Sequence, residues 1–158
     1  MKCAYKYCQR GGNVSKSDAV KEGTRYFHPE CFKEKKTVAE IVNLYHERVD
    51  PHPIEAYLWR TVQDLVYKDG NNAEYLLFAF RYCLDHGWTL HTPGGLRYVA
   101  KDVSSKKAWD NIQDAKIREK VKKDMEESST VDMTNWNLPT IQSTNKSNKQ
   151  KVSSILGV

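Results

Sequence analysis

The stretches CAYKYC at residues 3–8 and HPEC at residues 28–31 decide the fold of this 158-residue chain. They place three of its four cysteines and one histidine in the pattern C-x4-C-x19-H-x2-C. The N-terminus lacks the apolar stretch of a secretory leader, and thiols outside the secretory route stay reduced. Clustered cysteines in such a chain favour metal binding over disulfides.

The four donors have the chemistry of a zinc site. Thiolates and imidazole suit zinc and exclude magnesium or calcium, and zinc takes four such ligands in a tetrahedron. The sequence therefore predicts a structural Zn2+ bound by Cys3, Cys8, His28 and Cys31, with no position left open for water. Removal of such an ion should unfold this region. The competing interpretation is a set of ordinary buried cysteines beside an incidental histidine.

The segment around these donors also indicates a local architecture. Pro29 suits the first turn of a helix and Glu30 lies near the positive end of its dipole, which predicts a helix over 29–48. Glycines at 11, 12 and 23 predict a short hairpin before it. This stretch resembles a treble-clef zinc finger, and the run from His28 to Phe32 resembles the second ligand pair in the first half of a LIM domain. The resemblance implies a zinc module, and this sequence provides ligands for a single site.

Two helices are expected in the middle of the chain. Apolar residues recur at three- and four-residue steps after Pro53 and predict a helix to about Tyr67, with the stripe Ile54, Tyr57, Leu58, Val62, Leu65 and Val66. A turn at 69–72 leads to a second helix, which either asparagine of the turn can cap and which carries Leu76, Leu77, Phe80, Cys83 and Leu84. Cys83 lies within this apolar pattern, so we expect it to be a core thiol.

A third element is needed to cover this helical pair. The candidates are segment 96–100 and the helix over 29–48, whose apolar residues are Val38, Ile41, Val42 and Tyr45. The middle section also resembles the helical DnaD-like domains of bacterial and phage replication-initiation proteins, with Tyr98-Val99 as the aromatic–aliphatic pair and Trp109 as the later tryptophan. A generic helical hairpin that fills a core is the competing interpretation.

A lysine-rich segment and a polar tail complete the chain. Residues 104–127 mix charges with a sparse apolar stripe, which predicts a surface helix capped by Ser104 or Ser105. From residue 128 the composition is too polar to bury a core. We therefore expect a mainly α fold with a small zinc-bound β-hairpin, divided into a treble-clef-like zinc module at 1–48, a helical domain at 49–103, a lysine-rich helix at 104–127 and a disordered tail at 128–158.

The charge distribution permits contact with a polyanion. The chain holds 25 Lys and Arg against 20 Asp and Glu, and the positive excess lies in residues 1–50 and 104–158. If both ends flank one surface, nucleic-acid phosphates would meet Lys33, Lys35, Lys36, Arg97, Lys106 and Lys107, with Trp88, Tyr98 or Trp109 available for base stacking. Otherwise these mixed charges only form a solvated face.

No catalytic motif is present in the chain. It holds no P-loop, dinucleotide fingerprint, nucleophile elbow or paired-carboxylate site, so we expect no enzyme and no small-molecule substrate. No apolar run approaches the length of a membrane helix, which predicts a cytoplasmic protein without a membrane partner. We expect a zinc-stabilised nucleic-acid-binding accessory protein of DNA replication or transcription, encoded by a phage or mobile element. The alternative is a protein–protein adaptor that binds a host protein through its zinc finger and tail.

Overall fold

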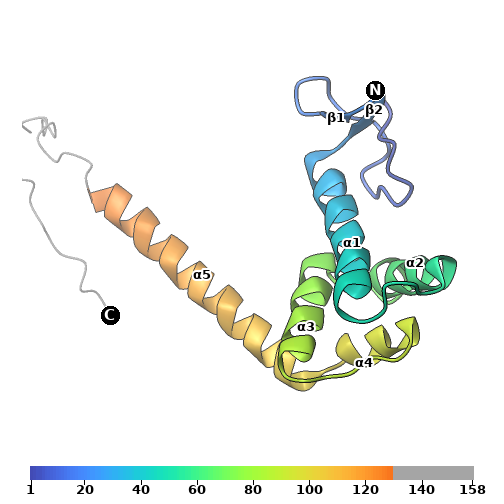
Figure 1. Ribbon diagram of the computed structural model, residues 1–158. Coiled ribbons are helices and arrows are strands. Elements are labelled where there is room, and N and C mark those ends of the chain that lie inside the picture. Colours follow the sequence, from blue (N-terminus) through green and yellow to red (C-terminus); the bar gives the residue numbers. More distant parts are fainter. Residues whose placement is uncertain (130–158) are drawn as a thin grey trace, which may run out of the picture. The chain divides into compact units, whose positions relative to one another are not determined.

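The computed structural model describes residues 1–129, which are mainly helical (Figure 1). Residues Met1–Glu119 form one compact unit, and Lys120–Val158 form a second, whose described part is the end of a long helix. The predicted mainly α fold with one small β-hairpin is confirmed. The predicted tail at 128–158 lies almost wholly outside the described residues. Within residues 1–129, no helix combines the length and the apolar character that crossing a bilayer requires.

A two-stranded antiparallel hairpin precedes the first helix, as the glycines predicted. Strand β1 spans Val20–Glu22 and strand β2 spans Arg25–Phe27. Gly23 lies in the turn between them with a φ of 60°, a backbone conformation that glycine adopts without strain. The N-terminal segment joins the hairpin because the N–H of Ala4 donates to the carbonyl of Tyr26 at 2.8 Å. The hairpin thus ties the beginning of the chain to the residues just before the first helix.

Helix α1 spans Pro29–Arg48, with the bounds that the sequence predicted. His28 is its N-cap residue, and Pro29 occupies the first turn, where the missing N–H would have no partner within the helix. The inner face is buried and includes the expected residues Val38, Ile41, Val42 and Tyr45 together with Leu44. Helix α1 therefore links the hairpin to the helical core.

Helix α2 spans Glu55–Gln63 and continues as a π-helical turn, η1, over Asp64–Lys68. The sequence placed the helix start too early, because Ile54 is the N-cap residue with extended backbone. Ile54 is 74% exposed and Tyr57 is 45% exposed, so the expectation that both lie on the buried stripe is wrong. The buried stripe begins at Leu58, which is fully covered.

Helix α3 spans Ala73–Asp85 and begins as predicted at an asparagine cap. The side-chain oxygen of Asn72 accepts hydrogen bonds from the N–H groups of Glu74 and Tyr75, at 2.8 and 3.3 Å. Cys83 is 1% exposed, which confirms the predicted core thiol. Burial raises the pKa of this thiol to about 11, so it stays protonated at neutral pH.

The core is closed by a short 3-10 turn, η2 (Pro93–Gly95), and helix α4 (Leu96–Val99). Leu96 and Val99 are fully buried in one cluster with the inner faces of α1, α2, η1 and α3. Both predicted candidates for the third element, α1 and segment 96–100, therefore cover the helical pair.

Helix α5 spans Val103–Ser129 and begins one residue before the predicted start. Its cap is Asp102, so the prediction of Ser104 or Ser105 as the cap is wrong. The Asp102 carboxylate accepts a hydrogen bond from the Ser105 N–H at 2.6 Å, and the Ser105 hydroxyl donates to the Asp102 carbonyl at 3.0 Å. The earlier start places Ser105 in the first helical turn, where it is buried.

We expect Asp102→Ala to lower the free energy of unfolding by about 1 kcal/mol, because it removes the acceptor that satisfies an N–H at the start of α5. Ser104→Ala is the matched control, since Ser104 is exposed; its free energy of unfolding should change by less than about 0.5 kcal/mol. Urea unfolding followed by circular dichroism measures both. Equal losses in the two variants would contradict the assignment of the cap.

Candidate metal centre

The structure brings together the four residues that the spacing pattern singled out. The ligating atoms of Cys3, Cys8, His28 and Cys31 all lie within 4.8 Å of one another. Cys31 is buried and the other three are partly buried. This donor group is close enough to hold one metal ion, as expected for a zinc finger.

Three pieces of local structure position the donors. Cys8 ends a turn in which its N–H donates to the carbonyl of Tyr5 at 3.2 Å. Cys3 is held because its N–H donates to the carbonyl of Gly12, whose φ of 75° suits glycine. Cys31 lies in the first turn of α1. Three segments therefore meet at one point: the turn at residues 3–8, which we call the cysteine turn, the loop that contains Gly12, and the start of α1.

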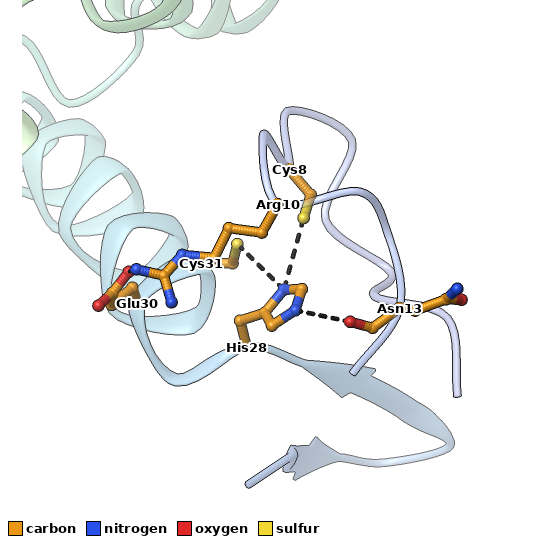
Figure 2. A network of polar contacts seen from close by, with 6 residues as sticks. All are labelled: Cys8, Arg10, Asn13, His28, Glu30 and Cys31. Atoms are coloured by element: carbon orange, nitrogen blue, oxygen red, sulfur yellow. Dashed lines mark hydrogen bonds and ion pairs between the residues drawn. The ribbon is translucent and has the colours of Figure 1, made fainter. Parts of the chain in front are cut away.

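The ring of His28 is oriented for metal binding. Its Nε2 lies 3.0 Å from the carbonyl oxygen of Asn13, which can only accept, so Nε2 carries the proton and donates (Figure 2). In the neutral ring Nδ1 then has a free lone pair, and this atom faces the sulfurs of Cys8 and Cys31 (Figure 2). A backbone acceptor on the outer nitrogen is the usual way in which proteins hold a ligating histidine.

The two distances from His28 Nδ1 to cysteine sulfurs agree with those around a tetrahedral ion. Bonds of about 2.3 Å to sulfur and 2.0 to 2.1 Å to nitrogen place the two donor atoms roughly 3.6 Å apart at the tetrahedral angle. His28 Nδ1 lies 3.4 Å from Cys8 Sγ and 3.7 Å from Cys31 Sγ. The four residues therefore offer one donor atom each to a single ion.

The surroundings of Cys8 and Cys31 shift the pKa values of their thiols in opposite directions. Backbone N–H groups of Arg10 and Gly12 lower the pKa of Cys8 to about 7, because they donate hydrogen bonds to its sulfur. Burial raises the pKa of Cys31 to about 12. A metal ion binds the thiolate forms and so displaces protons on binding.

A cluster of tyrosines docks the cysteine turn on the helices. The rings of Tyr7 and Tyr67 stack with centroids 3.6 Å apart, and the Tyr7 hydroxyl donates to Gln63 at 3.0 Å. The hydroxyls of Tyr5 and Tyr67 also contact each other. Tyr5 and Tyr7 lie between the ligands Cys3 and Cys8, so these contacts connect the metal centre with the end of α2 and with η1.

A groove, which we call the knuckle groove, runs along the junction between the cysteine turn and the helices. Its volume is about 240 Å³, and it is lined by residues of the cysteine turn, β2, α1, α2 and η1. Three of its residues, Lys6, Arg25 and Trp59, were not among the contacts predicted from the sequence. The signal for Trp59 was its position outside the buried stripe of α2, where a large aromatic side chain stays 36% exposed.

The predicted nucleic-acid contacts lie on three helices, α1, α4 and α5. Several of these cations already have internal partners: Lys33 pairs with Glu74, Lys35 with Glu22 and Arg97 with Asp64, while Lys36 lies over the ring of Phe32. Lys106 and Lys107 are exposed in the first turns of α5. Their role in binding nucleic acid stays a prediction.

The aromatic residues expected to stack on bases have different environments. Trp109 packs against α3, with ring centroids 6.0 Å from Tyr75 and 5.4 Å from Phe78. Trp88 is 40% exposed and Tyr98 is 74% exposed. Trp109 thus contributes to holding α5 on the core, whereas the other two remain accessible.

Comparison with known proteins yields no relative. No family model matches the chain, and neither the curated proteins nor the solved structures provide a match. The resemblances to LIM and DnaD-like domains therefore stay expectations.

We expect the purified chain to bind one equivalent of Co2+ with a thiolate charge-transfer band, because its four donors surround one point. Cys31→Ser should lower the affinity by more than the roughly 10- to 100-fold that is typical for loss of an outer-shell partner. Cys83→Ala is the control, since Cys83 lies in the core outside the donor group. Titration followed by visible absorbance tests this. Unchanged affinity in Cys31→Ser would contradict the donor set.

Proposed function

We propose that the protein is a nucleic-acid-binding accessory protein whose N-terminal module is held together by a structural zinc ion. Its role is to bind DNA in replication or transcription rather than to catalyse a reaction. The proposal combines the donor set of the metal centre with the charge of the groove beside it.

Zinc is the ion that this donor set suits best. Three thiols and one imidazole are soft ligands, and a tetrahedral arrangement of such ligands is typical of structural zinc. Three thiolates and one Zn2+ sum to −1, which changes the formal net charge of +5 to about +4. The zinc-bound protein keeps its positive excess.

The observation that carries the binding function is the charge of the knuckle groove. Every charged side chain that lines it is a cation, namely Lys6, Arg25 and Lys35. Lys35 pairs with Glu22 at the edge, whereas no carboxylate of the described residues pairs with Lys6 or Arg25. Lys6 Nζ lies 5.4 Å from the centroid of the Tyr7 ring. Two cations without a carboxylate partner beside exposed aromatic surface are suited to a phosphate backbone with its bases.

A protein–protein adaptor is the second candidate. Ile54 and Tyr57 are both exposed at the start of α2, where the sequence pattern placed them in the core. Exposed apolar side chains of this kind favour a protein partner. A partner that remains bound after nuclease treatment would support this function.

We expect the zinc-loaded chain to bind DNA with an affinity that falls as salt rises. Two phosphate contacts on a single strand correspond to a slope of about −1.4 in log affinity against log salt, and further contacts make it steeper. Chelation of the metal should abolish binding, because the module that carries Lys6 and Arg25 then loses its fold. Fluorescence anisotropy with labelled DNA measures both effects. A flat salt dependence, or no binding at low salt, would overturn the proposed function.

A further inference from the structure

Trp59 is the aromatic residue of the knuckle groove with a free ring. It is 36% exposed, and no other aromatic ring of the described residues stacks on it. The other ring systems are occupied: Tyr7 stacks on Tyr67, and Tyr5 meets both edge-on. The tyrosine rings therefore pack on one another, whereas the indole of Trp59 is partly exposed and carries no other aromatic ring.

The cations of the groove come from the metal-binding module. Lys6 lies in the cysteine turn and Arg25 begins β2, so neither side chain belongs to the helical core. Both are exposed, and neither has a carboxylate partner among the described residues. The groove thus combines an aromatic face from α2 with positive charge from the metal-binding module.

We propose that the knuckle groove binds single-stranded DNA, with one unpaired base stacked on Trp59 and the adjoining phosphates paired with Arg25 and Lys6. The inference rests on the proposed function and assigns its site and its substrate class. Charge complementarity identifies the occupant, because every charged residue in the lining is cationic and the strand is a polyanion.

The size of the groove and its polar groups narrow the substrate class. The volume of the groove, about 240 Å³, lies below the roughly 300 to 1,000 Å³ of small-molecule sites. A base, however, needs to place only one of its faces on an aromatic ring to stack. Bases of a duplex are already stacked in the helix and cannot reach Trp59 without flipping. A single strand presents its bases freely.

The tyrosine hydroxyls of the groove are already engaged. The Tyr7 hydroxyl donates to Gln63, and the hydroxyls of Tyr5 and Tyr67 contact each other. These groups are therefore not available to read base edges or to contact a 2′-hydroxyl, the group that distinguishes RNA. Binding should be tolerant of sequence and should give RNA no advantage over DNA.

The test uses the zinc-loaded full chain and labelled oligothymidylate of about ten nucleotides. Trp59→Ala should weaken binding about 10-fold, as expected for loss of one base–aromatic stack, and Trp59→Phe should restore most of the affinity. Tyr57→Ala is the matched control, since Tyr57 is a 45% exposed aromatic residue of the same helix that lies outside the groove, and the affinity of this variant should be unchanged. Arg25→Gln should reduce the salt slope by about 0.7, whereas Lys101→Gln, outside the groove, should not.

The outcomes separate this inference from the proposed function. If the wild-type chain binds DNA but Trp59→Ala and Arg25→Gln bind equally well, the groove is not the site, although the proposed function stands. Tighter binding of duplex DNA or of oligouridylate would also overturn the inference while leaving nucleic-acid binding in place. If no nucleic acid binds at low salt, both fail. Metal stoichiometry and circular dichroism of each variant establish whether the variant is folded. If Trp59→Ala does not fold, Arg25→Gln tests the inference instead, because Arg25 is exposed.

Discussion

The meeting of three sulfurs and one imidazole nitrogen is the interaction on which the N-terminal quarter of the structure depends. In residues 1–27 only Val14 and Phe27 are buried apolar residues, too few to hold a turn, a loop and a hairpin together. An ion bound by the four donors would supply the stabilisation that such a small core cannot. The backbone carbonyl of Asn13 completes the centre by orienting His28.

The residues between the ligands Cys3 and Cys8 also connect the metal centre with the helical core. Tyr5 and Tyr7 lie within the cysteine turn, and their contacts with Tyr67 and Gln63 join the metal centre to α2 and η1. A π-helical turn is an uncommon element that often accompanies function, and here it presents Tyr67 to the cysteine turn. The knuckle groove exists only while both sides of this junction are in place.

Much of the fold follows from local sequence rules. The bounds of α1 follow from Pro29 and the apolar periodicity, and the start of α3 follows from the capping chemistry of Asn72. The errors occur at helix starts. Both Asp102 and Ser105 can cap a helix, and local preference alone does not decide which of them occupies the N-cap position. The exposure of Ile54 has the same origin, because helix α2 begins one residue after it.

The sequence by itself determined the four metal donors and the buried helix faces, because ligand spacing and the helical period operate over short stretches of chain. Only the tertiary structure decided that Trp59 and Arg25 line one groove. The helical period shows that Trp59 lies off the buried stripe, but it carries no information about which distant segment packs beside that face. Docking of the cysteine turn on α2 and η1 supplies that information, since it brings together side chains from separate parts of the chain.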